Sequence, residues 1–282
     1  MPSSIIVVVL LAALLHASWN ALAKGRNGAD PLVGTLAVAL GSGVASLCAL
    51  TAVGLPDVAS LWCLVTSGVI HVVYFVLVGL SYRHADYSAV YPLMRGCAPL
   101  ITTLAGGVIL GEPLTAGLLA GVALLSGGVI GLGAHALMKG GLSRRALAAA
   151  GLNVAVIVSY TLVDGIGARL SGNPAGYVTA TLVLSAIMLL PIVIALRGRA
   201  ALADLRAHWR MGLLGGSMAT VSYGVALWAM TQAPIGAVAA MRETAVLFSA
   251  AIGALLLGER FGPPRWVAAA AICTGLVLIR MG

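Results

Sequence analysis

Long apolar stretches alternate with short polar segments along the whole chain. Each stretch has about 20 residues, the length that a helix needs to cross the hydrocarbon core of a bilayer. The short polar segments leave no room for a separate soluble domain. The pattern therefore predicts ten transmembrane helices, at residues 4–23, 32–53, 59–81, 87–110, 115–137, 147–168, 175–196, 211–231, 235–257 and 264–281.

Two parts of this pattern are copies of one another. Residues 79–128 and residues 226–275 align without a gap at a constant offset of 147. The alignment places Arg95 opposite Arg242 and the pair Gly111-Glu112 opposite Gly258-Glu259. An offset held across a helix, a loop and the next helix indicates duplication of a structural unit.

The duplication predicts two domains of five helices each, residues 1–138 and 139–282. Because five is odd, the second repeat enters the membrane from the opposite side, so the repeats are inverted. Inverted repeats around a central cavity are typical of secondary transporters. The predicted fold class is thus an all-α membrane protein with two inverted five-helix repeats enclosing such a cavity.

The composition agrees with a membrane protein, since 61% of the 282 residues are hydrophobic and 9% are charged. The net charge of +8 does not indicate a nucleic-acid partner, because the basic residues fall in separate short loops. Twelve of them follow odd-numbered spans, and the opposite side holds only Arg169 and Arg280. The positive-inside rule then places both termini outside the cytoplasm, in a bacterial-type inner membrane.

Polar and aromatic side chains form stripes of helical period inside the apolar spans. Because these stripes cannot all face lipid, we expect them to line the cavity. The candidate substrate-binding residues are Arg95, Arg242, Tyr91, Trp19, Asn20, His71, Tyr74 and Tyr160. The candidates for binding a coupling ion are His16, Asp164 and Glu243.

The two arginines are the most informative of these residues. An arginine near the centre of a transmembrane helix costs about 2.5–3.5 kcal/mol, so Arg95 and Arg242 need a compensating environment. In a cavity they could hold a carboxylate, phosphonate or phosphate through forked hydrogen bonds. The alternative is a structural role, with each arginine paired to Glu243, Asp164 or a free backbone carbonyl. For Glu112 and Glu259, which end their spans beside a turn, we expect a capping or loop role.

No motif of a known enzyme or ATPase occurs in the sequence. A phosphate-binding Gly-rich loop, zinc-protease and serine-hydrolase motifs and paired cysteines are all absent. We therefore predict no catalytic residues, no metal and no cofactor, and transport driven by a solute gradient or by a coupling proton or sodium ion. Glycines four residues apart, such as Gly212 and Gly216, allow close helix packing within a monomer or across a homodimer.

The sequence resembles the ten-helix EamA-type branch of the drug/metabolite transporter superfamily. The resemblance rests on the segment from His16 to Lys24 and on the twin segments from Tyr91 to Glu112 and from Met241 to Glu259. It implies a basket of ten helices with a central solute cavity and alternating access. Members of this superfamily usually have both termini in the cytoplasm, whereas the loop charges of this chain favour the reverse.

The predicted function is therefore secondary active transport of a small anionic or zwitterionic metabolite, such as an amino acid or a phosphorylated or phosphonate compound. An exporter of cationic or hydrophobic drugs is the alternative within transport, and it would depend on Asp164 or Glu243 instead of the arginines. A membrane-embedded enzyme that acts on lipid-linked substrates is the alternative from another class.

Overall fold

The computed structural model describes residues 1–24, 31–84, 87–140, 144–198, 200–257 and 262–281. Within these ranges the chain is helical apart from short turns, and it contains no strand. In chain order the elements are α1 (Ser3–Lys24), α2 (Pro31–Val53), η1 (Val58–Ser60), α3 (Leu61–His84), α4 (Tyr87–Leu110), α5 (Ala116–Gly140), α6 (Arg144–Leu170), α7 (Pro174–Arg197), α8 (Ala200–Ala207), α9 (Trp209–Gln232), α10 (Ile235–Arg242), α11 (Ala245–Leu257) and α12 (Pro263–Met281).

Ten segments of the described chain are long and apolar enough to cross a membrane, as the sequence predicts. Helices suit this solvent because each satisfies its backbone hydrogen bonds internally. The ends carry local signals as well: the Asn173 side chain accepts a hydrogen bond from the Gly176 N–H at the start of α7, where Pro174 takes the first position. Gly198, with φ of 69°, ends the same helix.

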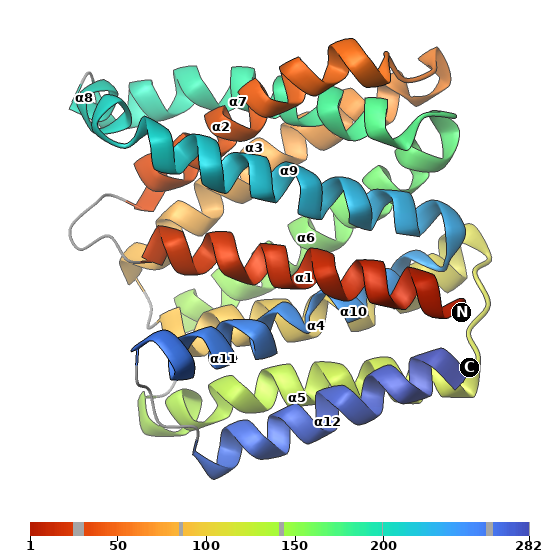
Figure 1. Ribbon diagram of the computed structural model, residues 1–282. Coiled ribbons are helices and arrows are strands. Elements are labelled where there is room, and N and C mark those ends of the chain that lie inside the picture. The colour runs from red at the N-terminus through yellow and green to blue at the C-terminus, as the bar shows by residue number, and fades with distance from the viewer. Residues whose placement is uncertain (25–30, 85–86, 141–143, 199, 258–261, 282) are drawn as a thin grey trace.

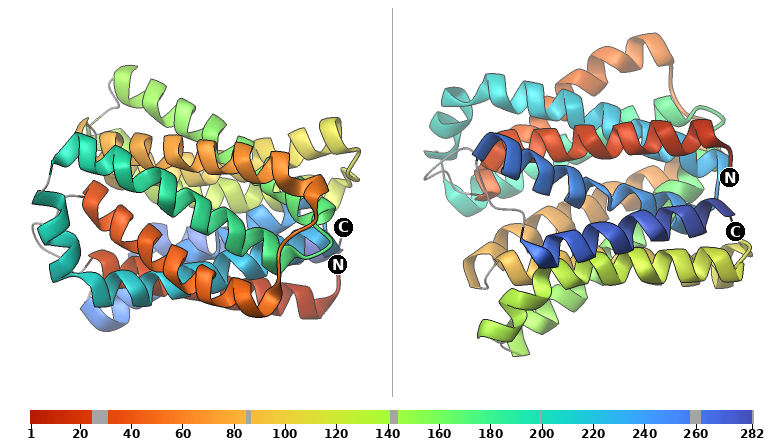
Figure 2. Two further views of the ribbon diagram at one scale, coloured as in Figure 1. Left: turned by 90° about the horizontal axis from the view of Figure 1, so that it is seen from above. Right: turned by 60° about the horizontal axis from the view of Figure 1, so that its bottom comes forward.

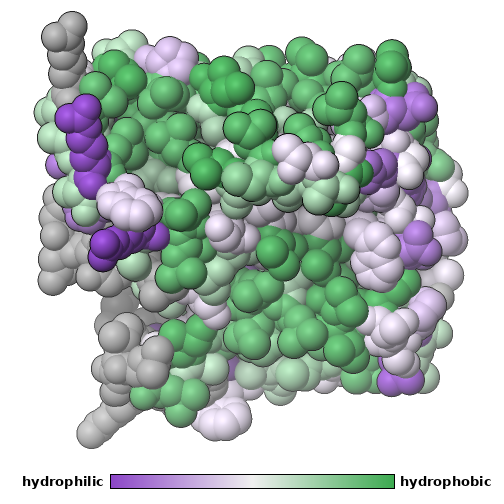
Figure 3. All heavy atoms as spheres, turned by 45° about the horizontal axis from the view of Figure 1, so that its top comes forward, coloured by the Kyte–Doolittle hydropathy of each residue, from purple (hydrophilic) through white to green (hydrophobic). Residues whose placement is uncertain are grey.

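The surface has the distribution of polarity that a bilayer requires. Hydrophobic side chains cover a broad band across the middle of the molecule, and hydrophilic side chains gather at its two ends (Figure 3). Strongly exposed hydrophobic residues include Val108, Leu255 and Val267. The chain is accordingly a multi-pass membrane protein.

Both termini lie at the same end of the bundle, and α8 lies at the other end (Figures 1 and 2). Contacts between helices also follow a pattern across the two predicted repeats. Helix α1 packs against α9, and α6 packs against α3; likewise α1 packs against α10 and α11, and α6 packs against α4. When the first five spans are mapped onto the last five, the α1–α9 contact becomes the α6–α3 contact. The contacts of α1 with α10 and α11 likewise become the contact of α6 with α4.

The antiparallel helices α5 and α12 show the same reciprocity at atomic detail (Figure 1). A Cβ atom added to Gly275 would lie 2.6 Å from the carbonyl oxygen of Gly121, and one added to Gly128 would lie 3.0 Å from that of Ala268. The offset of 147 maps Gly128 onto Gly275 and Gly121 onto Ala268. Contacts that map onto each other in this way are expected where a two-fold axis relates two copies.

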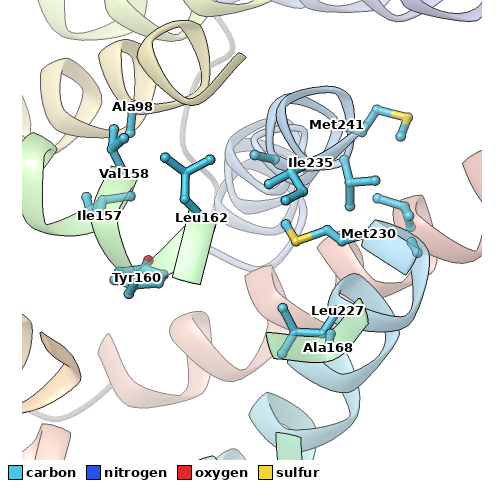
Figure 4. Packing of buried hydrophobic residues seen from close by; sticks show 14 of the residues in the cluster. Ala98, Ile157, Val158, Tyr160, Leu162, Ala168, Leu227, Met230, Ile235 and Met241 are labelled. Carbon is cyan, nitrogen blue, oxygen red and sulfur yellow. The ribbon is translucent and has the colours of Figure 1, made fainter. Parts of the chain in front are cut away.

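Buried apolar side chains from α4, α6, α9 and α10 meet in the largest core cluster (Figure 4). Ala98, Leu162, Leu227 and Ile235 are among its members, and Tyr160 lies at its edge in this view. The cluster holds these four helices together close to the charged side chains described below.

Two features of the fold differ from the sequence prediction. The span predicted at 235–257 is not one helix, because the chain breaks at Glu243 and Thr244 into α10 and α11. Helix α4, the matching span of the other copy, continues through Pro92 and Pro99. The short helix α8 was also not predicted.

Candidate functional site

The two arginines of the repeat lie inside the bundle in different surroundings. Arg95, on α4, is 7% exposed, and its Nε lies 2.9 Å from Oε2 of Glu243, which is 5% exposed. The ion pair joins the two copies of the repeat across the bundle. The first of the predicted structural roles for Arg95, pairing with Glu243, is therefore observed.

Glu243 reaches Arg95 from the break between α10 and α11. At this point the chain makes hydrogen bonds between residues three apart, from the Glu243 N–H to the Ala240 carbonyl and from the Thr244 N–H to the Met241 carbonyl. The Thr244 hydroxyl donates to the same Met241 carbonyl at 2.7 Å. These bonds satisfy backbone groups that the interrupted helix would otherwise leave unpaired.

Arg242, the last residue of α10, has no comparable partner. Its guanidinium carbon lies 5.2 Å from the ring centroid of Tyr223, a cation–π contact. Among the residues that the structure describes, Arg242 makes no ion pair and no hydrogen bond through its side chain. Its donors are therefore available to a bound anion.

Asp164, on α6, is fully buried between two tyrosines. The hydroxyl of Tyr177 donates to Oδ1 at 2.9 Å, and the hydroxyl of Tyr223 donates to Oδ2. Tyr223 thus contacts Asp164 through its hydroxyl and Arg242 through its ring face. This tyrosine connects a buried carboxyl to the arginine that lacks an ion partner.

Aromatic rings pack beside this chain of contacts. The His71 ring centroid lies 4.6 Å from that of Tyr160 and 5.9 Å from that of Tyr223, and Tyr74 packs on Tyr160 at 5.5 Å. The Nδ1 atom of His71 lies 3.0 Å from both the hydroxyl and the carbonyl oxygen of Ser67. One ring nitrogen of this histidine is therefore engaged within its own helix.

Helix α1 contributes a second group. The rings of His16 and Trp19 meet edge to face with centroids 5.3 Å apart, and the charges of Arg95 and Arg242 both act on His16. The Asn20 amide donates to the His16 carbonyl at 2.8 Å, so its nitrogen bonds within α1. His16 and Trp19, more than Asn20, are placed to contact a solute.

Several groups near Arg242 have hydrogen-bond donors without protein acceptors. Within the described part of the chain, neither the Tyr160 hydroxyl nor the His16 ring has a hydrogen-bond partner, and the indole N–H of Trp19 is buried without one. Buried polar groups are normally hydrogen-bonded. A set of open donors beside an arginine is suited to a ligand rich in acceptor oxygens.

The structure thus brings most of the predicted site residues together. Arg95, Glu243, Arg242, Asp164 and Tyr160 interact electrostatically as one cluster, with the His71 and Tyr74 rings packed against Tyr160. The Tyr91 side chain and Gly258-Glu259 lie outside the described residues. No described group of three or more His, Cys, Asp or Glu side chains could hold a metal ion.

Two central residues were missed by the sequence analysis, Tyr177 and Tyr223. Neither lies on a polar stripe with other candidates, which explains the omission. A signal was nonetheless present, because a tyrosine in the middle of a transmembrane span needs a partner for its hydroxyl. Tyr177 is fully buried and Tyr223 half-buried, and Asp164 supplies that partner to both.

Glu112 lies in the loop between α4 and α5, and this loop is at the end of the bundle that holds the termini (Figure 1). Its carboxylate accepts hydrogen bonds from Arg169 and from the Ile235 N–H at the start of α10, 3.0 Å from Oε2. Arg169 also donates to the carbonyls of Met230 and Ala233. The predicted capping role is thus found, although Glu112 caps a helix of the other repeat.

Comparison with known proteins identifies a family domain in one half of the chain and a similar fold over its whole length. Residues 145–281 match the EamA-like transporter family. A solved crystal structure of another protein superposes with a TM-score of 0.78 over 100% of this chain and 99% of that chain, at 16% sequence identity. At that identity the likeness shows a shared fold. No curated protein sequence matches the chain.

Proposed function

The chain carries an EamA-like transporter domain, and from this premise we propose that it is a secondary carrier of small organic anions or zwitterions. The solute would bind between the repeats, and its chemical form would not change. Alternating access would then arise from movement of the two five-helix repeats about the central charged cluster.

The observation that carries this proposal is the guanidinium of Arg242, which has no ion-pair partner among the residues that the structure describes. Arg95 and Glu243 neutralise each other, and both oxygens of Asp164 accept tyrosine hydroxyls. A mid-membrane arginine without a counter-ion is costly, and a carboxylate, phosphonate or phosphate on the solute would supply the missing charge. The open donors of Tyr160 and His16 would complete the anion's coordination.

The aromatic rings support a solute with some apolar surface. Ligand sites combine apolar walls with a few polar groups that fix orientation. Here His71, Tyr74 and Tyr160 provide such walls next to the arginine. We therefore favour a compact organic anion over an inorganic ion.

The loop charges support an orientation with both termini outside the cytoplasm of a bacterial-type inner membrane. Arg197, Arg206 and Arg210 flank or belong to α8, at the end opposite the termini (Figure 1). Cysteine accessibility at residues introduced after Met1 and next to Arg206 tests this directly. Modification of the α8 site from the outside of intact cells would contradict the proposed orientation.

A thermal-shift screen followed by flux measurement tests the function. The probes are glycine, L-glutamate, methylphosphonate and glycerol 3-phosphate, with tetraphenylphosphonium as a cationic arm. A ligand that prefers the folded protein raises its melting temperature. We expect a shift from at least one anionic or zwitterionic probe, and uptake of that probe unchanged into proteoliposomes.

Arg242→Gln provides the decisive variant, and Arg280→Gln at the exposed end of α12 is the matched control. Losing a charge-assisted hydrogen bond costs about 1.5–3 kcal/mol, which corresponds to roughly 10–100-fold in affinity. Full flux by Arg242→Gln would remove this arginine from the mechanism. A rise in melting temperature only with tetraphenylphosphonium would favour a cation exporter. Chemical conversion of a probe would favour an enzyme.

A further inference from the structure

We propose that Asp164 binds the proton that couples solute movement to the proton gradient, and that Tyr223 transmits its protonation to Arg242. The proposal rests on the carrier function above and names its driving ion. Asp164 belongs to α6, in the middle of the candidate site, and no described cation contacts its carboxyl group. A fully buried carboxyl without a counter-charge is a functional group by default in a membrane protein.

The geometry around Asp164 limits what it can bind. Each carboxylate oxygen accepts one phenol hydroxyl, Oδ1 from Tyr177 on α7 and Oδ2 from Tyr223 on α9. A sodium ion needs several oxygen ligands, whereas both carboxylate oxygens are already engaged by phenol hydroxyls. A proton needs only one of the carboxylate oxygens.

The titratable and charged groups near Asp164 come from every helix packed on α6. Cys63 of α3, Tyr177 of α7, Tyr223 of α9 and Tyr160 of α6 itself interact with it electrostatically. On α4 and α10, the charged residues Arg95, Glu243 and Arg242 act on Tyr160 or Tyr223. The two phenols are therefore its direct partners, and the arginines are one residue further away.

Protonation changes what these phenols can do. When Oδ2 takes a proton, the new O–H bond turns this oxygen from an acceptor into a donor. The Tyr223 hydroxyl can then accept from Asp164 but no longer donate to the same oxygen, so its own proton must turn to another acceptor. Because the Tyr223 ring lies against the Arg242 guanidinium, this rearrangement changes the position of the arginine that binds the anion.

Infrared spectroscopy of the purified full-length protein without solute tests the proton site alone. The observable is the C=O stretching band of a protonated carboxylic acid, followed as the pH is lowered. All eight acidic side chains contribute to this band at low pH, so each variant is compared with the wild type in a difference spectrum. We expect a contribution that Asp164→Asn removes and that the control Asp204→Asn, at an exposed residue of α8, retains. Identical bands in the wild type and in Asp164→Asn overturn the proposal.

Tyr223→Phe provides a second variant, which keeps the ring against Arg242 but removes the hydroxyl. It should retain the band at a changed frequency, because the deleted hydroxyl bonds directly to this carboxyl and the C=O stretch depends on its hydrogen bonds. An unchanged frequency overturns the link to Tyr223 even if Asp164→Asn does not fold.

The coupling is measured in proteoliposomes with a radiolabelled member of the probe panel. Asp164→Asn should still exchange solute when there is no pH gradient. When a pH gradient is imposed, its solute accumulation should be at least tenfold lower than that of the wild type. Gradient-driven accumulation that persists in this variant, or that follows sodium instead of pH, overturns the coupling role. Loss of all binding in the thermal-shift screen would instead reject the carrier function, and the infrared result would stand independently.

Discussion

The segments Met94-Arg95-Gly96-Cys97 and Met241-Arg242-Glu243-Thr244 occupy matching positions in the two copies of the repeat, yet they fold differently. The first continues as helix α4, whereas the second ends α10 and breaks before α11. Gly96 explains part of the difference, because a Cβ there would lie 2.5 Å from Cγ1 of Ile130 on α5. Glu243 stands at the equivalent position and forms an ion pair with Arg95.

The comparison shows how a duplicated arginine acquires two roles. In one copy a glycine lets the helix pack on its neighbour, and the arginine is neutralised by the other copy. In the second copy the helix ends at Arg242, whose guanidinium contacts the Tyr223 ring and makes no ion pair among the described residues. Arg95 thus has an ion-pair partner in the other copy, whereas Arg242 has none among the described residues, which is why we propose Arg242 as the solute-binding arginine.

The largest effect is expected from Arg95→Gln. This substitution leaves the buried carboxylate of Glu243 without its partner, and breaking a buried ion pair costs about 3–5 kcal/mol. We expect a comparable fall in the free energy of unfolding, measured by denaturation in detergent micelles. The double variant Arg95→Gln with Glu243→Gln should recover much of it. If the double variant lost as much free energy of unfolding as the two single variants together, the ion pair between Arg95 and Glu243 would be contradicted.

Gly96→Ala should lower the free energy of unfolding by about 1–3 kcal/mol, the usual range for overpacking. The added methyl would meet Ile130 and the Ser126 carbonyl oxygen, at 2.5 and 2.9 Å. The matched control is Gly127→Ala on α5, where a Cβ meets no atom within 4 Å. Equal melting temperatures for the two variants would show that contact with α5 does not select glycine at this position.

Arg242→Gln should affect stability in the opposite direction from Arg95→Gln. Removing a mid-membrane arginine relieves about 2.5–3.5 kcal/mol of insertion cost, and losing its cation–π contact offsets up to about 2 kcal/mol of that. The net expectation is a gain of about 1 kcal/mol in the same denaturation assay. A loss as large as that of Arg95→Gln would mean that both arginines are structural.

The smallest effect is expected at the break itself. Thr244→Val removes the hydroxyl that donates to the Met241 carbonyl, and hydrogen bonds inside membrane proteins average about 0.6 kcal/mol. Thr51→Val, which removes a similar bond at the exposed end of α2, is the control. A destabilisation of several kcal/mol for Thr244→Val alone would assign the break to this hydroxyl instead of to Glu243.

The sequence predicts the helices well, because length and hydropathy largely determine which segments cross a bilayer. Helix α7, for example, was predicted at 175–196 and is observed at Pro174–Arg197. The break after Arg242 was not predictable from local signals, since neither glutamate nor threonine is a strong helix breaker. Glu243, at the break, forms an ion pair with the distant residue Arg95, and no local pattern reveals that pairing.

The same limit applies to the site. Arg95, Arg242, Asp164 and Tyr160 could be found because polar residues in apolar spans are rare and need partners. Packing between helices that are far apart in sequence decides which partner each of these polar residues contacts. For that reason Tyr177 was missed, although it donates to Asp164.

Glu112 gives the short helix α10 a fixed attachment. Its carboxylate accepts from the Ile235 N–H, and seven residues later, about 10 Å along the axis, the helix ends at Arg242. A helix of eight residues hardly bends, so movement of its first residue displaces its last residue as well. Loss of the hydrogen bond between Glu112 and the Ile235 N–H would therefore also displace Arg242, the residue that we propose to bind the solute.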